Sequence, residues 1–187
     1  MTDSLYQMTA EYNPAHDRIL FRVSTQKRLE YRVWLTRRIV KSLWGVAIRS
    51  FEAEVEAEVF TDATPSATNT PTKQEPRVKQ AVMSMKHQEA IQSSDFSKKH
   101  DIKTKPPPEG QRPLLAVKAE IGKTQEGSIR LTLHTLERKN VNLNLNEKTL
   151  HAVCHMLQRA ADKAGWDLEL RVGDAGSILT GDERVLN

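Results

Sequence analysis

The apolar and polar positions of this chain form one pattern that occurs twice, with corresponding residues 110 positions apart. The first copy spans residues 17–51, and its apolar positions are Ile19, Phe21, Val23, Tyr31, Val33, Leu35, Val40, Leu43 and Ala47. The second copy has Ile129, Leu131, Leu133, Val141, Leu143, Leu145, Leu150, Val153 and Leu157. Alternation followed by three- and four-residue spacing predicts a strand, a turn, a strand and a helix in each copy.

The repeated pattern predicts an α+β fold. We expect internally duplicated strand–strand–helix units that form an antiparallel sheet, with the helices packed on one face. Thr36 and Asn146 precede the two helices and are suitable N-caps, because their side-chain oxygens can accept from free amides of the first turn. Gly165 is placed to end the second helix in the left-handed conformation, with Trp166 folding back on the last turn.

Composition divides the chain into five parts. Prolines at 65, 71, 76, 106–108 and 113 fall between the copies, among polar residues typical of linkers. We therefore expect a flexible N-terminal arm (1–17), a first half (18–60), a flexible insertion with a short helix at about 78–96 (61–113), a second half (114–172) and a flexible tail (173–187). The second half contains an extra strand before its hairpin and a closing strand at 168–172.

Two segments allow alternative structures. Residues 51–60 alternate as a strand does, but alanine and glutamate favour continuing the helix to about residue 55. The 78–96 segment has Val78, Val82 and Met85 on one side of a marginal helix. That helix could dock on the core, order on a partner, or cover the open face of the sheet.

Composition indicates a cytoplasmic protein that does not enter a membrane. Cys154 is the single cysteine, so no disulfide can form within the chain. The N-terminus lacks the layout of a signal peptide, and no apolar run reaches membrane-spanning length. The formal charge is +4, and the insertion carries nine basic and six acidic residues, so it contributes most of the excess. A basic total on its own is weak evidence for nucleic-acid binding.

The chain shows no catalytic pattern. It has no nucleophile elbow, phosphate-binding glycine loop or dinucleotide fingerprint. His151, Cys154 and His155 lie within one helical turn, but Cys154 falls in the buried stripe and a fourth zinc ligand is missing from the pattern. We therefore expect a protein that is not an enzyme and has no cofactor-binding or metal-binding residues.

The sheet face opposite the core is the better candidate for function. Residues out of phase with the core include Arg22, Arg32, Trp34, Arg130 and His134, which form the candidate interaction surface. Between residues 18 and 49 there are nine basic residues and one acid, Glu30. Such a face could follow a phosphate backbone and stack a base on the tryptophan. The simpler interpretation is a solvated sheet face whose arginine stems cover apolar surface.

Duplicated units of antiparallel strands followed by a helix resemble the topology of PUR-repeat and Whirly-type proteins. The resemblance implies binding of single-stranded nucleic acid. The absence of catalytic residues and the long insertion, which could order on a partner, favour a non-enzymatic protein–protein interaction or adaptor protein whose partner is another protein. The alternative function is single-stranded nucleic-acid binding by the basic open face of the first repeat.

Overall fold

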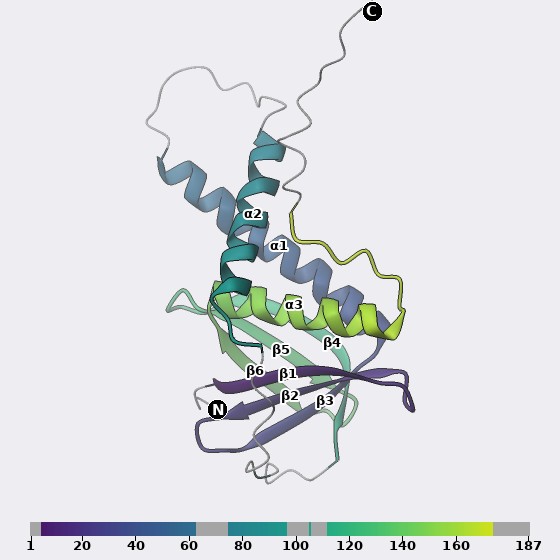
Figure 1. Cartoon of the computed structure of the whole chain (residues 1–187). Helices are drawn as coiled ribbons and strands as arrows, with labels where there is room; N and C mark the ends of the chain where they lie inside the picture. The colour runs from purple at the N-terminus through teal and green to yellow at the C-terminus, as the bar shows by residue number, and fades with distance from the viewer. Residues whose placement is uncertain (1–4, 63–74, 97–104, 106–111, 174–187) are drawn as a thin grey trace, which may run out of the picture.

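The computed structural model describes residues 5–62, 75–96, 105 and 112–173. The predicted linkers and the tail beyond residue 173 lie mostly outside these residues. Figure 1 shows the elements, which are β1 (Leu5–Asn13), β2 (Arg18–Thr25), β3 (Glu30–Leu35), α1 (Arg37–Asp62), α2 (Glu75–Gln92), β4 (Leu114–Lys123), β5 (Ile129–Thr135), β6 (Asn140–Leu145) and α3 (Glu147–Ala164). The α+β class is confirmed.

The six strands form one sheet in the order of the sequence. β1–β3 and β4–β6 are each antiparallel, and a short parallel pairing of Val33 with Leu114 and of Trp34 with Leu115 joins them. The sheet is therefore mixed, and the prediction of a wholly antiparallel sheet is wrong at this junction. The long crossover through α1 and α2 brings the chain back to the end of the sheet at which β3 began, so β4 runs parallel to β3.

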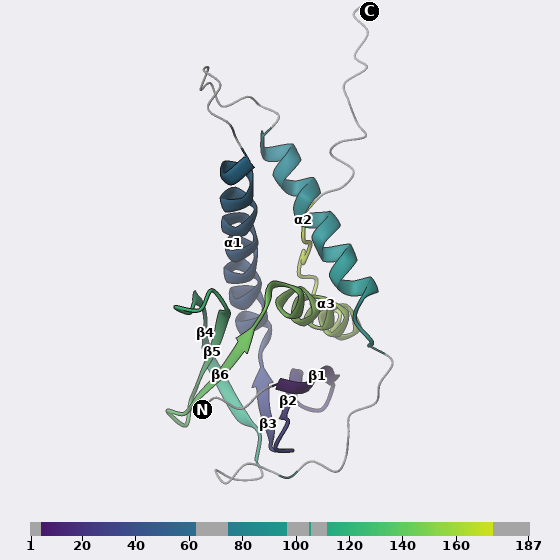
Figure 2. The ribbon, with the colours of Figure 1, turned by 90° about the vertical axis from the view of Figure 1, so that its left-hand side faces the viewer.

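The helices lie on one side of the sheet in two layers. α1 packs mainly on β4, whereas α3 packs mainly on β1, so each helix covers the first strand of the other unit. α2 contacts α3 and α1 and stands farther from the strands (Figures 1 and 2). The interpretation that the 78–96 segment covers the open sheet face is therefore wrong.

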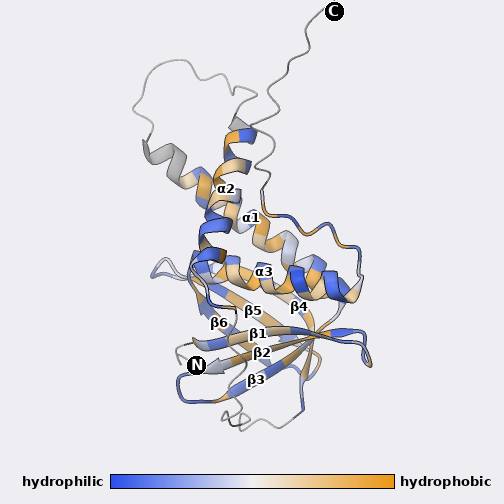
Figure 3. Cartoon of the chain, viewed as in Figure 1, coloured by the Kyte–Doolittle hydropathy of each residue, from blue (hydrophilic) through white to orange (hydrophobic). Residues whose placement is uncertain are grey.

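The core consists of the alternating positions of the sheet and one stripe of each helix. All the aliphatic core positions predicted for the two hairpins are buried, and Phe21 is 1% exposed. Val40, Leu43, Ala47 and Phe51 of α1 and Leu150, Val153 and Leu157 of α3 complete it. Figure 3 shows apolar stretches along the strands and on α1 and α3. Burial of one face per strand fixes the register, since a shift by one residue would turn this face to solvent.

The prediction of a flexible arm over residues 1–17 is wrong for Leu5–Asn13, which form the strand β1. Leu5–Asn13 pairs with β2 along its length, and Met8, Ala10 and Tyr12 pack against the core. The apolar alternation of β1 is weak because Ala10 is small, so the strand is stabilised by ladder hydrogen bonds and by α3 rather than by its own pattern. Pro14 follows the strand and lies in the turn to β2.

The two three-stranded meanders match in register. Ile19 pairs with Leu35 in the first, and Ile129 pairs with Leu145 in the second. The outer strands match as well, because β1 has an irregularity between Leu5 and Gln7 and β4 has one between Ala116 and Lys118, each opposite the end of the neighbouring strand. β4 therefore has a counterpart in β1, which the sequence pattern did not identify.

The helix ends follow the predicted caps. The Thr36 hydroxyl accepts from Ile39 N at 3.4 Å, and the Asn146 side chain accepts from Thr149 N at 2.8 Å. α1 continues to Asp62, so the strand alternative for residues 51–60 is wrong and the helix is longer than expected. Lys123 and Lys79 pair with two of its glutamates, Glu54 and Glu56, and reduce the repulsion within the acidic run.

Residues 168–172 do not form the predicted closing strand. Leu170 and Val172 are buried, but the segment runs beside the helices and no pairing joins it to the sheet within the described residues. At Gly173 the segment approaches α2 so closely that a Cβ atom on this residue would lie 2.3 Å from Gln80 O. The alternation of this segment therefore reflects burial against helices and not strand pairing.

Gly165→Ala should lower the free energy of unfolding by about 1 kcal/mol, because Gly165 has φ 63° in the α3 C-cap and alanine is strained there. Gly122→Ala is the matched control, since Gly122 has no positive φ and no heavy atom within 4 Å of the added Cβ. Urea unfolding of both variants measures the difference. Equal stability of the two variants would contradict the capping role.

Candidate interaction surfaces

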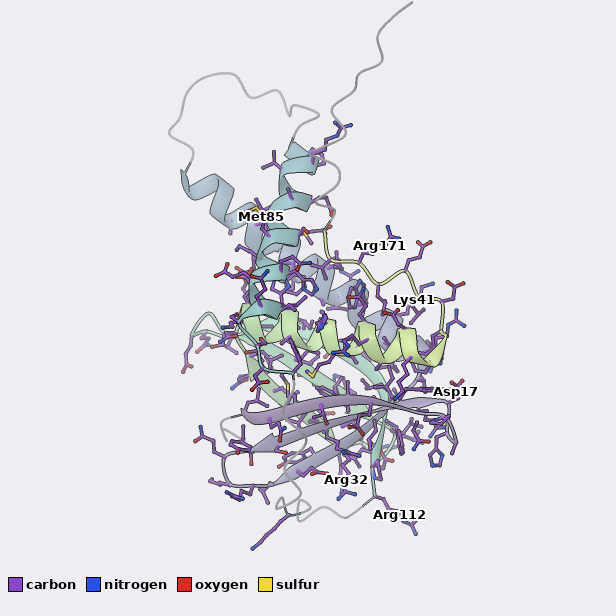
Figure 4. All side chains as sticks on the ribbon, viewed as in Figure 1. Asp17, Arg32, Lys41, Met85, Arg112 and Arg171 are labelled. Atoms are coloured by element: carbon purple, nitrogen blue, oxygen red, sulfur yellow. The ribbon has the colours of Figure 1, made fainter. Side chains whose placement is uncertain are left out.

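All five predicted surface residues lie on the sheet face turned away from the helices, because side chains alternate along each strand. Arg22 and Arg32 are direct neighbours across β2 and β3, and Trp34 lies one pleat further along β3. Arg130 and His134 lie on β5, in the other meander. The structure therefore divides the predicted surface into two groups. Figure 4 shows Arg32 and Arg112 on the lower side of the sheet, away from the helices.

Carboxylates neutralise part of the first group. Arg32 Nε lies 2.6 Å from Glu30 Oε1, and Glu30 is almost fully buried. Arg22 lies 3.5 Å from the exposed carboxylate of Glu11. Glu11 lies on β1, in the segment expected to be a flexible arm, so sequence reasoning missed its effect on the charge of this face.

The second group is also internally paired. His134 contacts Glu120 at 2.8 Å through Nε2 and Asn140 at 3.0 Å through Nδ1. Hydrogen bonds from Lys118 and then His134 lower the pKa of Glu120 to about 2. Thr132 donates to Asn142 at 2.9 Å. Of the two predicted residues in this half, His134 belongs to this network of polar side chains, whereas Arg130 is an exposed cation.

Trp34 has an aromatic neighbour that its sequence position does not predict. The ring of His16, from the turn between β1 and β2, lies 5.1 Å from the indole at an interplanar angle of 51°. Trp34 is half-buried, and His16 is exposed. The pair offers two adjacent ring systems, so Trp34 is not the one aromatic group on this part of the first meander.

The N-terminal half of α1 carries a second basic surface. Arg37, Arg38, Lys41 and Arg49 are exposed, and the first two lie at the positive end of the helix dipole. The acidic half of the helix contacts Lys79 and Lys123. The acidic half is thus partly neutralised by lysines, whereas the N-terminal half presents four exposed basic side chains.

α2 has a buried side and an exposed apolar side. Ala81, Met83, His87 and Ala90 are buried against the other helices. Val78 and Met85 are 50% and 71% exposed, and Val82 between them is half-buried. The stripe Val78–Val82–Met85, hereafter the α2 stripe, was expected to be the helix's apolar side. The structure instead turns most of it to solvent.

A histidine cluster lies where α2 meets α3. The Nδ1 atoms of His87 and His151 are 3.1 Å apart, and the ring of Phe51 stacks on His151 at 3.8 Å. Burial first, and then Arg159, lowers the pKa of His155. Sequence spacing grouped His151 and His155 but missed His87, because no local pattern reports a residue 64 positions away. Across the described residues, no three His, Cys, Asp or Glu side chains are arranged to hold a metal ion.

Comparison with protein-family models, curated proteins and solved structures found no match to this chain. Function must therefore be argued from the surfaces themselves. No helix in the part of the chain that the structure describes is long and apolar enough to cross a membrane.

Cys154 should react slowly with iodoacetamide in the folded protein. Its thiol is 2% exposed, and burial raises its pKa to about 12. At pH 8 we expect alkylation on the order of a hundredfold slower than in the urea-unfolded chain, because the thiolate is the reactive form. Ser42→Cys, at an exposed position of α1, supplies a fast-reacting control thiol. Equal rates for the two thiols would show that α3 does not bury Cys154.

Proposed function

We propose that this protein is a non-enzymatic interaction or adaptor protein that binds another protein through the α2 stripe. The observation that supports this most directly is the exposure of Val78 and Met85 on α2, whose other side already buries Met83, two alanines and His87. Large apolar side chains that stay exposed on the outer side of a helix, while its other side is already buried, are typical of a surface that contacts another protein. Their exposure is accounted for if a second protein covers them.

The chemistry of the stripe defines the kind of partner. Valine and methionine at spacings of four and three residues fit an apolar groove or another helix, and methionine adapts to irregular surfaces. The α2 helix is held to α1 by Lys79–Glu56 at 2.8 Å and to α3 by Lys86–Glu147 at 3.1 Å. These ion pairs orient the stripe outward. The single cysteine fits a reducing compartment such as the cytoplasm.

Met85→Glu and Val78→Glu should each weaken binding to the partner at least tenfold, because a charge would have to be desolvated in an apolar contact. The partner is first recovered by affinity purification from the native host, then purified and titrated against each variant by calorimetry. Leu136→Glu is the matched control, since Leu136 is 65% exposed but lies between β5 and β6. Failure to recover a stoichiometric partner, or unchanged affinity in both α2 variants, would remove the support for this function.

We also propose that the two units arose by duplication of one strand–strand–strand–helix element. The matched register of the hairpins and the matched irregularities in β1 and β4 support this proposal. The reciprocal packing of α1 on β4 and α3 on β1 supports it further, because two copies related by a pseudo-two-fold axis would pack in this way.

Binding of single-stranded nucleic acid is the second candidate function. The Trp34–His16 ring pair beside Arg22 and Arg32 favours it, because bases stack on aromatic rings while arginines contact phosphates. The carboxylates of Glu11 and Glu30 compete with phosphate for those arginines. This competition is why we rank nucleic acid second.

If the second function holds, the protein should bind a labelled single-stranded oligonucleotide, with affinity that falls steeply as salt rises. The double variant Arg32→Ala/Trp34→Ala should reduce affinity roughly tenfold or more, through loss of one stacked base and one phosphate contact. Fluorescence anisotropy measures both effects, and Arg138→Ala is an exposed control on the opposite meander. No anisotropy change at low salt would exclude this function.

A further inference from the structure

A buried pair of imidazoles is one of the contacts that join α2 to α3. His87 of α2 is 6% exposed and His151 of α3 is 1% exposed, and their Nδ1 atoms are 3.1 Å apart. At this distance one Nδ1 donates a hydrogen bond and the other accepts it. The contact therefore requires that at least one of the two rings is neutral.

The surroundings of the pair are mostly aromatic. Phe51 of α1 lies flat against His151 with an interplanar angle of 11°. His155 of α3 contacts the His87 ring at a centroid distance of 6.4 Å and is itself covered by Phe96. His151 Nε2 is buried and makes no hydrogen bond to the described residues.

The charged groups around the pair offer little compensation for a second positive charge. Glu147 Oε1 lies 3.9 Å from His151 Nε2, but the same oxygen accepts from Lys86 at 3.1 Å. Arg159, on α3, adds a positive charge that acts on His155. The α1 carboxylate that pairs with α2, Glu56, is engaged by Lys79. Among the described residues, Glu147 is the carboxylate recorded beside these histidines. His151 and then Lys86 lower its pKa, so it can offset one imidazolium charge but is already shared with a lysine.

We propose that acid releases α2 from α1 and α3, with the His87–His151 pair as the proton-sensitive element. When both imidazoles take up protons from solvent, both Nδ1 atoms carry hydrogens, so their hydrogen bond is lost and two positive charges face each other across 3.1 Å. When α2 separates from α3, water can hydrogen-bond to both rings and the repulsion between the two positive charges is relieved.

The pKa of His87 supports this mechanism. Burial, followed by the charges of His151 and His155, lowers it from 6.5 to about 4. Released α2 binds this proton near pH 6.5, whereas docked α2 binds it near pH 4. Docking is therefore strongest above pH 6.5 and weakens as the pH falls from 6.5 towards 4, by a factor on the order of a hundred.

The effect should be local to α2. α2 buries one large apolar side chain, Met83, beside the small Ala81 and Ala90, and its main contacts are with α1 and α3 rather than with the sheet. The contacts of α1 and α3 with the strands are made by large aliphatic and aromatic side chains. Acid should therefore open α2 before it unfolds the sheet.

Amide hydrogen exchange of the full chain tests the proposal. Protection factors of α2 peptides, corrected for the intrinsic pH dependence of exchange, should fall at least tenfold between pH 7.5 and pH 5. Those of β2 and β5 should change less than twofold. Unchanged protection of α2 over this range would overturn the proposal. Because no binding partner is involved, the result is independent of the function proposed for the α2 stripe.

A variant of His87 tests whether the His87–His151 pair causes the pH dependence of α2 protection. His87→Asn keeps a polar atom near the Nδ1 position but cannot titrate, so its α2 protection should vary less than threefold over the same pH range. His134→Asn, a change of a histidine on the open sheet face, is the matched control and should retain the wild-type response. If His87→Asn retains the full pH response, the pair is not the sensor. If that variant does not dock α2, the NMR titration of His87 in the wild type decides, because an ordinary pKa near 6.5 without loss of protection rules out the mechanism.

Discussion

The structure depends on two helices that cover one apolar face of the sheet, each packed on the strands of the other unit. α1 leaves the first meander and covers β4, and α3 leaves the second and covers β1. The strands themselves are joined by only a short parallel contact between β3 and β4. Most of the attachment between the units is therefore apolar burial under the exchanged helices. Because each unit lacks a helix over its own first strand, neither can bury its sheet without the other.

This arrangement leaves the two sides of the protein with different chemistry. The uncovered sheet face has rows of arginine, glutamate, histidine and asparagine, and Arg22, Arg32 and His134 each contact a carboxylate there. The helical side ends in a third layer, α2, that the sheet does not need for its own burial. An exposed apolar surface that the core does not require is available to bind a partner. We therefore rank α2 above the partly neutralised sheet face as the candidate binding surface.

α2 combines features that conflict locally. It buries Met83, two alanines and His87, while Val78 and Met85 are exposed. Ion pairs with α1 and α3 help to hold this orientation. A helix held by polar and titratable contacts docks less firmly than one held by a large apolar stripe. Such an element is suited to change its position or its partner while the sheet beneath it stays folded.

The sequence by itself determined the hairpins, their buried faces, the helix caps and the α+β class, because strand alternation, helical spacing and capping residues are local signals. It also placed Arg22, Arg32, Trp34, Arg130 and His134 on one face, since side-chain parity is a property of each strand. Only the tertiary structure decided that β1 is a strand, that β3 and β4 are parallel, and that 168–172 packs beside helices. It alone brought His87 to His151 and His16 to Trp34. These outcomes depend on contacts between residues far apart in the chain, and no spacing within one segment reports which distant segment will satisfy its hydrogen bonds or cover its apolar side.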